Sequence, residues 1–365
     1  MSRVSINHVW KIYEGNVIAV RDASFTCEDG EFLAILGPSG SGKSSILRML
    51  AGLEEITRGE ILFDGKVVNK LNPSERNIAL AFESYALYPR LTIYENIAFP
   101  LRAQGLDKPE IDKKVKLISE ALDLADFLKK RPSSLSGGHQ QRISLARALV
   151  REPNVTLLDE PISHMDQRVR VEIRARIRRL HDELKTTTMY VTHDQAEAIS
   201  LCDRLVVLNL AEVQQVGTVD EIWNQPANKF VASFVGDPRM NFINGKVESP
   251  QHVSIPTKEG KKTFESTGEI DQKYVGSEEI TIGVRPQQIE LSLSKQQEAS
   301  IPGSVKIIEF RGDDAVLAVE LEDFNNTRVR VVVPLERAGY VGDTVWLEFK
   351  PEIIHLFDKE VPIIR

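Results

Sequence analysis

Short apolar runs alternate with helical stretches over the first two thirds of the chain. The runs at Glu31–Leu36, Val155–Leu158 and Thr188–Thr192 each have the length of one buried strand. Stretches of helical composition at Lys43–Leu50 and Asp166–Leu184 follow two of them. Strand, crossover helix and strand in this order predict a largely parallel sheet that is covered by helices.

Between residues 91 and 150 the pattern changes to helix alone. Apolar residues within Pro109–Leu124 recur every three to four positions, which is typical of a helix with one buried face. A second helix is expected over Ser136–Val150, with Ser136 as its N-cap. We therefore expect a helical subdomain at about residues 91–150, inserted into the α/β domain.

After about residue 236 the alternation has a period of two. Valine alternates with arginine across Arg328–Val331, and apolar residues at every second position of Val345–Phe349 repeat the pattern. Turn residues separate these segments at short intervals, which favours a small all-β, OB-like domain. We expect domains at residues 1–235 and 236–365, joined by the connector Gly236–Gly245.

Composition and charge narrow the classes of function. The chain has 365 residues, with 46 Lys and Arg against 53 Asp and Glu, and a formal net charge of −7. An acidic balance argues against nucleic acid as a partner. The two cysteines, Cys27 and Cys202, lack CxxC spacing, and no apolar run approaches the thickness of a bilayer. With no secretory signal at the N-terminus, the chain is expected to remain in the cytoplasm.

A glycine-rich loop supplies the strongest chemical signal. Gly37–Ser44 reads GPSGSGKS and matches GxxxxGK[ST] between a predicted strand and a predicted helix. Its backbone N–H groups and the helix N-terminus can bind phosphates, the Lys43 ammonium can bind the β- and γ-phosphates, and the Ser44 hydroxyl can coordinate Mg²⁺. We predict a nucleotide site formed by Gly37, Pro38, Ser39, Gly40, Ser41, Gly42, Lys43, Ser44 and Ser45.

Two carboxylates end the predicted strand at Val155–Leu158. Asp159 is the expected outer ligand of Mg²⁺, and Glu160 is the expected base that activates or positions water. Such a pair is also common at a solvated strand end. Combined with the phosphate-binding loop, it favours hydrolysis of the bound nucleotide.

Downstream motifs resemble those of the ABC ATPases. Leu135–Gly138, followed by His-Gln-Gln-Arg, resembles their signature, Ser163–Asp166 resembles their D-loop, and Thr192–Asp194 contains the switch histidine. The resemblance implies an α/β P-loop NTPase fold, in which His193 contacts the γ-phosphate and the catalytic water while Tyr13 stacks on adenine. It also implies nucleotide contacts from Ser136, Gly137, Gly138, His139 and Asp166.

Further segments resemble the carbohydrate-uptake (MalK-like) importers. They are Glu83–Pro89, Tyr94–Pro100, Phe234–Phe242 and Gly283–Pro286. The resemblance implies an ATP-driven motor for uptake of a sugar, polyol or glycerol-phosphate-like solute, and a regulatory C-terminal domain. The implied partners are a second ATPase chain, most simply a copy of this one, two integral-membrane permease subunits and an extracytoplasmic solute-binding protein. The chain would then lie peripherally on the cytoplasmic face of the plasma membrane.

Four positions depart from the family pattern. Glu83 replaces the Q-loop glutamine, which in the family gives an amide oxygen to Mg²⁺ and relays the state of the nucleotide to the membrane subunits. Our hypothesis is that Glu83 keeps the metal contact but changes hydrolysis or coupling. His139 replaces a glutamine of the signature, and His164-Met165 replaces Asn-Leu in the D-loop.

Two other functions remain open from the sequence. A soluble ABC ATPase acting on nucleic acid or ribosomes would usually carry two cassettes, zinc-binding cysteines or a coiled-coil insertion. A nucleotide-binding regulator with little turnover is supported only by Glu83. The six arginines of Asp166–Leu184 could form a solvated helix face or bind an anionic partner. The acidic residues interleaved with them favour the solvated face.

Overall fold

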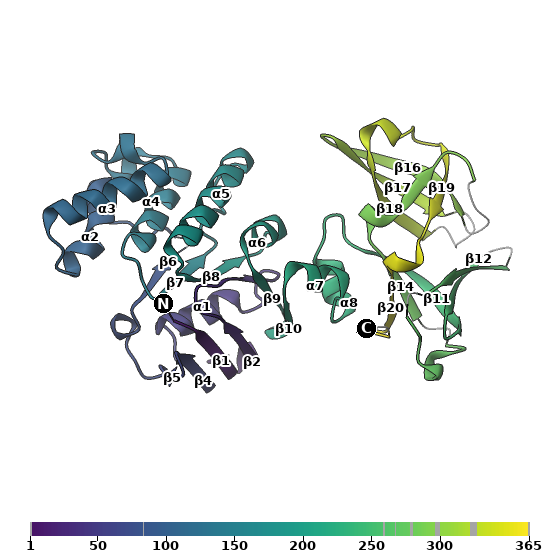
Figure 1. Cartoon of the computed structure of the whole chain (residues 1–365), viewed down its shortest axis with the longest axis horizontal. Coiled ribbons are helices and arrows are strands. Elements are labelled where there is room, and N and C mark those ends of the chain that lie inside the picture. Colours follow the sequence, from purple (N-terminus) through teal and green to yellow (C-terminus); the bar gives the residue numbers. More distant parts are fainter. Residues whose placement is uncertain are drawn as a thin grey trace. The chain divides into compact units, whose positions relative to one another are not determined.

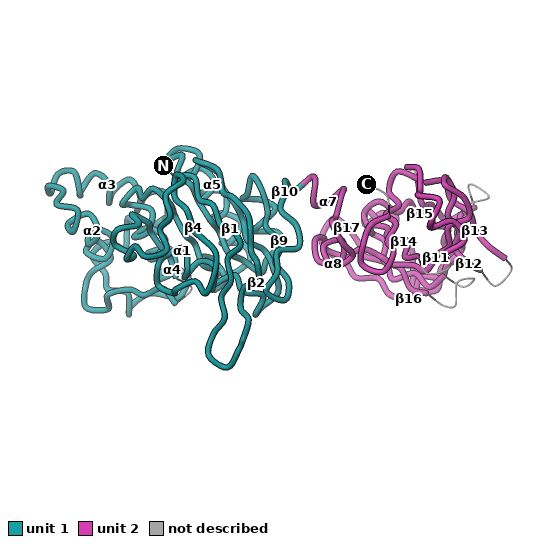
Figure 2. The backbone as a smooth tube through the Cα atoms, turned by 90° about the horizontal axis from the view of Figure 1, so that it is seen from below, with its two compact units in different colours: residues 1–219 teal, residues 220–365 magenta. Residues whose placement is uncertain are grey.

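Two compact units make up the chain, residues 1–219 and residues 220–365 (Figure 2). The computed structural model describes residues 2–82, 84–257, 260–266, 268–277, 280–295, 300–321 and 327–363. The boundary between the units lies earlier than the domain boundary after residue 235 that the sequence predicts. The reason is that helices α7 (Val219–Asn224) and α8 (Lys229–Phe234) are bonded to the second unit, where Lys229 N donates to Glu360 O at 2.9 Å.

A six-stranded sheet forms the centre of the first unit (Figure 1). Its strands, in spatial order, are β10 (Glu212–Gly217), β9 (Arg204–Asn209), β3 (Phe32–Leu36), β8 (Thr187–Thr192), β7 (Val155–Asp159) and β6 (Ile78–Ala81). All neighbours are parallel except β10 and β9. Strands β3, β7 and β8 are buried at every position, as their unbroken apolar runs predict. The three predicted strands are confirmed to within one residue.

A second sheet in the first unit is antiparallel. It contains β2 (Val17–Cys27), β1 (Val4–Tyr13), β4 (Arg58–Phe63) and β5 (Lys66–Val67), in that order. Helix α1 (Lys43–Ala51) shares one hydrophobic core with this sheet and with β3. On the opposite side of β3, Phe32 belongs to a core shared with helix α5 (Gln167–Leu184) and with Leu201, which ends helix α6 (Gln195–Leu201).

Three helices occupy the region that the sequence predicts as helical. They are α2 (Ile93–Ala103), α3 (Lys108–Ala121) and α4 (Gly137–Leu149). A capping box starts α2, because Thr92 Oγ1 accepts from Glu95 N and a Glu95 carboxylate oxygen accepts from Thr92 N. Helix α3 ends before the predicted Leu124, since the backbone leaves helical geometry at Leu122.

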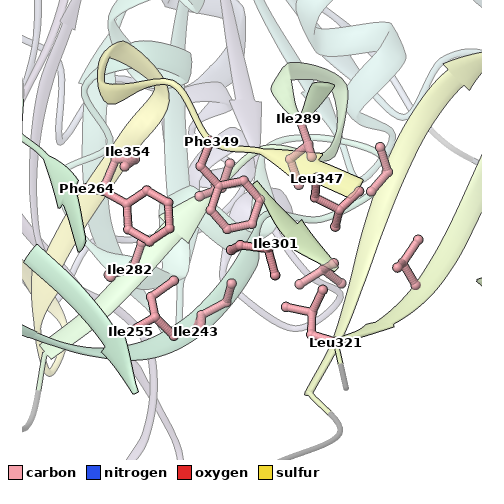
Figure 3. Close-up of a cluster of buried hydrophobic side chains, with 14 of the residues drawn as sticks. Ile243, Ile255, Phe264, Ile282, Ile289, Ile301, Leu321, Leu347, Phe349 and Ile354 are labelled. Carbon is pink, nitrogen blue, oxygen red and sulfur yellow. The ribbon is translucent and has the colours of Figure 1, made fainter. Parts of the chain in front are cut away.

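The second unit is rich in strands, as the period-two pattern predicts. One sheet has the order β13 (Gly260–Glu265), β12 (His252–Thr257), β11 (Asn241–Ser249), β14 (Ile280–Val284), β20 (Ile354–Asp358) and β21 (Val361–Pro362). The other has the order β15 (Glu290–Ser292), β19 (Thr344–Glu348), β16 (Ile301–Arg311), β17 (Asp314–Leu321) and β18 (Thr327–Pro334). Side chains from both sheets meet in one hydrophobic core (Figure 3).

A buried arginine ties the helices of the second unit to its sheet. Arg285 follows β14 and is 1% exposed. Its guanidinium donates to Trp223 O at 2.6 and 3.1 Å and to Val235 O at 2.7 Å. The same group lies 3.8 Å from the centroid of the Trp223 ring. A side chain at Gly236, whose φ is +132°, would meet Arg285 at 3.0 Å, so glycine is required there.

Candidate functional site

The predicted catalytic segments meet at one edge of the parallel sheet. Strand β8 lies between β3 and β7, and all three run in the same direction. The phosphate-binding loop follows β3, Glu160 follows β7, and His193 follows β8. Because the carboxyl ends of parallel strands lie at a common edge, the three segments converge there.

Steric constraints fix two glycines of the phosphate-binding loop. A Cβ atom at Gly37 would lie 2.4 Å from Leu208 O, and a Cβ atom at Gly42 would lie 2.1 Å from Ala19 O. Gly42 also has φ of +103°, and Gly40 has φ of +80°. The loop conformation therefore requires glycine at both ends and left-handed backbone within it.

The side chain of Lys43, the first residue of α1, folds back into the preceding glycine-rich loop. Its Nζ atom donates to Gly37 O and to Pro38 O, both at 2.9 Å. Burial lowers the pKa of Lys43, and the negative charges of Glu160 and Asp159 oppose that shift. The Ser41 hydroxyl is buried and has no hydrogen-bond partner in the part of the chain that the structure describes. An orphaned hydroxyl and a cation inside a glycine loop fit a phosphate group.

Ser44 and Asp159 place two oxygen ligands side by side. Ser44 Oγ donates to Asp159 Oδ1 at 3.2 Å, from the first turn of α1 to the end of β7. Hard cations such as Mg²⁺ prefer this hydroxyl and carboxylate chemistry, with phosphate oxygens completing the shell. Among the described residues, no group of three or more His, Cys, Asp and Glu side chains could hold a metal by itself. The pair therefore fits a metal held jointly with a phosphate.

Glu160 and His193 are in direct contact. His193 Nδ1 lies 3.0 Å from Glu160 Oε2, and the imidazole is more exposed than the carboxylate. Glu160 has φ of +46°, an uncommon conformation for a residue with a side chain, and its N–H donates to Val191 O at 3.0 Å. The turn after β7 therefore directs Glu160 toward β8 instead of along β7.

The other predicted loop contacts lie at the start of α1. The Tyr13 hydroxyl lies 3.3 Å from Ser45 Oγ, which brings the predicted adenine-stacking ring to that helix. The Lys11 ammonium lies 4.7 Å from the Tyr13 ring centroid. Ser39 is exposed at the tip of the loop. Glu83 lies outside the described residues.

The signature segment differs in detail from the predicted cap. Ser136 occupies the N-cap position of α4, but its side chain caps no backbone N–H. Its hydroxyl lies instead 2.7 Å from His139 Nδ1, one turn along the helix. Burial, with the charges of Arg142 and Lys130, lowers the pKa of His139. A Cβ atom at Gly137 would lie 3.1 Å from the Tyr85 hydroxyl, and one at Gly138 would lie 3.6 Å from the Met165 side chain.

The D-loop, Ser163–Asp166, is held in place mainly by hydrogen bonds to its backbone. The Asp166 carboxylate accepts from Val169 N at 3.1 Å and so caps α5; its predicted contact with nucleotide stays a prediction. The sequence motifs predict no role in the site for Gln141 or Arg170, although both contact this segment. Arg170 Nε donates to Met165 O at 2.9 Å, and Arg170 also pairs with Asp194 at 3.3 Å. The available signal was that Gln141 belongs to the segment His139–Arg142 after Gly138, and that Arg170 lies four residues after Asp166.

Acidic partners occupy several arginines of α5. Arg176 pairs with Asp123 at 2.7 Å, and Arg178 pairs with Asp203 at 2.9 Å and Asp182 at 3.1 Å. Paired arginines of this kind form a solvated, charge-balanced helix face.

Comparison with known families matches both units. Residues 20–163 match the family model described as ABC transporter, and residues 282–357 match the TOBE domain. These matches confirm the predicted α/β ATPase fold followed by a β-rich, OB-like domain.

Individual proteins are similar over nearly their whole length. The chain is 40% identical over 372 residues to the uncharacterized ABC transporter ATP-binding protein YcjV of Escherichia coli O157:H7, covering 100% of this chain and 99% of that protein. It is also 40% identical over 365 residues to the maltose/maltodextrin import ATP-binding protein MalK of Yersinia pestis bv. Antiqua (strain Antiqua), covering 99% and 96%. Among solved structures, a dimeric post-hydrolysis state of the ATP-binding cassette MJ0796, bound to ADP and Pi, matches with 31% identity and a TM-score of 0.55, covering 59% of this chain and 98% of that one.

Proposed function

Because the chain belongs to the ATP-binding proteins of ABC transporters, we propose that it is the motor of an importer for a sugar, polyol or glycerol-phosphate-like solute. It is an ABC transporter ATPase. The similarity to MalK, whose name gives maltose and maltodextrin import, supports the proposed solute class. YcjV is equally similar, and its name gives no solute.

The observation that carries the proposed hydrolysis is the convergence of Lys43, Asp159 and Glu160 at one sheet edge. On binding ATP, the Lys43 ammonium would exchange the carbonyls of Gly37 and Pro38 for β- and γ-phosphate oxygens. Ser44 and Asp159 would hold Mg²⁺, which neutralises charge on the phosphates when bound.

Glu160 is the proposed base in this mechanism. Its carboxylate would orient the attacking water and accept its proton as the bond to the γ-phosphorus forms and ADP leaves. His193, in contact with Glu160, would hold that carboxylate and contact the γ-phosphate. Tyr13 and Ser45 would bind the adenine end and the phosphate end of the same nucleotide.

A pair of chains would complete each site. This chain has one phosphate-binding loop and one signature, so two copies would enclose two ATP molecules. Each copy would cover the nucleotide of the other with Ser136, Gly137, Gly138, His139 and Asp166. The similar cassette MJ0796 has been solved as a dimer, which supports this arrangement.

Permease subunits would dock on the helical region. No helix among the described residues is both long enough and apolar enough to cross a bilayer. Tyr88 and Phe99 are 41% and 44% exposed, and their ring centroids are 4.8 Å apart. An exposed aromatic pair suits a protein partner. We therefore propose that one permease subunit docks here on each ATPase chain, so that the pair of chains carries two permease subunits. The chain would then lie on the cytoplasmic face of the membrane, and a solute-binding protein would join through the permease subunits.

Hydrolysis of Mg-ATP by the purified chain tests the motor. Glu160→Gln should lower kcat by roughly 10²- to 10⁴-fold while fluorescent ATP analogues still bind, because only the base is lost. The control is Glu60→Gln, an exposed carboxylate of β4, which should keep full kcat. Full kcat in Glu160→Gln would contradict the assignment. Binding without turnover in the parent, even with permease subunits present, would favour the regulator.

Uptake by cells tests the solute class. A strain that lacks the chain should lose uptake of one labelled sugar, polyol or glycerol phosphate, and the parent gene should restore it. Unchanged uptake of all three classes would contradict the proposed importer, even if the chain hydrolyses ATP.

A further inference from the structure

One buried amide connects the signature helix to the turn that carries Glu160. Gln141 lies in α4 and is 1% exposed. Its Nε2 donates to Glu160 O at 3.0 Å and to Ser163 Oγ at 3.4 Å, and its Oε1 accepts from His164 N at 3.3 Å. Only this orientation of the amide pairs a donor with the carbonyl and an acceptor with the N–H.

The turn that Gln141 holds is an unfavourable one. Glu160 has φ of +46°, which costs a residue with a Cβ atom about 1 kcal/mol or more. Four hydrogen bonds among the described residues fix it in place: Glu160 N to Val191 O, Ser163 N and Ser163 Oγ to Glu160 O at 3.3 and 3.0 Å, and Gln141 Nε2 to Glu160 O. Of these, only Gln141 comes from outside the sheet edge and the turn itself.

The direction of the Glu160 side chain depends on this turn. With the backbone left-handed, the carboxylate reaches His193 Nδ1 at 3.0 Å. If the turn relaxed toward the right-handed region, the Cα–Cβ bond would rotate and the carboxylate would move away from His193. A displacement of about 1 Å at a catalytic group can cost on the order of 10²-fold in rate.

We propose that Gln141 is a positioning residue for hydrolysis, which fixes the orientation of Glu160 from the signature helix. Gln141 lies one helical turn after Gly137, so the amide makes the signature and the Glu160–His164 turn one rigid element. The inference rests on the proposed role of Glu160 as the base. It predicts that the signature helix acts on the nucleotide site of its own chain, in addition to any contact with a second chain.

The neighbouring glutamine provides a matched control. Gln140 Nε2 donates to Pro132 O at 3.1 Å and to Leu135 O at 3.0 Å, so it also holds main-chain carbonyls from α4. Its partners are Pro132, which precedes the signature, and Leu135, the first residue of the signature; neither lies in the turn of Glu160. Gln140→Met and Gln141→Met therefore each remove an amide from the same helix, and only Gln141→Met frees the turn.

Steady-state kinetics of the full chain decides between positioning and a merely structural role. Gln141→Met should lower kcat by roughly ten- to a hundredfold and leave the affinity for a fluorescent ATP analogue within about twofold. Gln140→Met should keep kcat within about twofold, at a similar loss of melting temperature. An equal fall of kcat in both variants, or unchanged kcat in Gln141→Met, would overturn the proposal.

A double-mutant cycle tests the route through Glu160. Since Gln141 acts on the rate only by orienting that carboxylate, Gln141→Met should have little further effect on the residual rate of Glu160→Gln. Full multiplication of the two effects would overturn the proposal. Full kcat in Glu160→Gln would instead reject the base assignment, so the two failures are distinguishable. Should Gln141→Met not fold, Gln141→Asn keeps an amide that is one methylene too short, and kcat equal to the parent there would also overturn the proposal.

Discussion

Replacement of Arg285 by methionine tests how a buried cation without a carboxylate partner contributes to the second unit. Among the described residues, its hydrogen-bond partners are the carbonyl oxygens of Trp223 and Val235. Burial lowers the pKa of Arg285 to about 10 from the ordinary 12.5. Holding the charge inside the protein therefore costs about 3 kcal/mol.

The contacts of Arg285 outweigh that cost. Methionine would leave two carbonyl acceptors without donors, at about 1–3 kcal/mol each. It would also remove the cation from the face of the Trp223 ring, a contact worth about 2 kcal/mol when desolvated. Set against the relief of the buried charge, the expected net loss is about 3 kcal/mol in the free energy of unfolding. Lysine keeps the charge but lacks the fork of donors, so Arg285→Lys should not restore the parent stability.

Chemical denaturation measures this loss. Guanidinium unfolding is followed by far-ultraviolet circular dichroism and by tryptophan fluorescence, with Trp223 reporting on the site itself. The exposed Arg337 of the same unit serves as control, and Arg337→Met should change stability by less than about 0.5 kcal/mol. Parent-like or greater stability in Arg285→Met would refute the reasoning, because it would show that desolvation of the cation exceeds its contacts.

Two further changes probe each unit separately. Burial, with the nearby Arg285 cation, lowers the pKa of His355 to about 4, so the folded state disfavours protonation of this imidazole. The free energy of unfolding should therefore be highest above about pH 6.5 and fall by about 2.5 kcal/mol as the pH drops to about 4.5. His355→Gln should flatten that dependence in pH-dependent unfolding curves, and an unchanged slope would contradict the assignment. In the first unit, Thr92→Ala removes the side-chain half of the α2 capping box and should cost about 1 kcal/mol in denaturant unfolding, whereas Thr92→Ser should recover most of it; equal stability of the two variants would contradict the cap.

Much of the geometry of the candidate nucleotide site was predictable because its parts are local. The glycine loop, the carboxylates after a strand and the histidine after another strand each occupy a few consecutive residues. The rule that parallel strands end at a common edge then brings Lys43, Asp159 and Glu160 together, as the structure has them. The strands of the second unit were equally predictable, because a strand that is buried on one face has apolar residues at every second position.

Features that depend on distant contacts could not be predicted. The hydrogen bond from Gln141 to Glu160 joins a helix to a turn after a strand, and no local pattern encodes that pairing. Two distant hydrogen bonds join α7 and α8 to the second unit. Arg285, after β14, donates to Trp223 O in α7, and Lys229 N in α8 donates to Glu360 O. The bond between Ser136 and His139 competes with capping, and propensity alone favours the cap.

The order of strands in the central sheet has a consequence for synthesis on the ribosome. Among the described strands, β3, which precedes the phosphate-binding loop, has β8 and β9 as its neighbours. The antiparallel β1–β2 hairpin can form as soon as it emerges, whereas β3 has no partner strand until residues 187–192 of β8 have left the exit tunnel. Its second edge stays open until residues 204–209 of β9 follow. A nascent chain that stalls before β8 therefore carries the whole glycine motif next to an unpaired strand, exposed to association with other chains and without an assembled candidate ATP site.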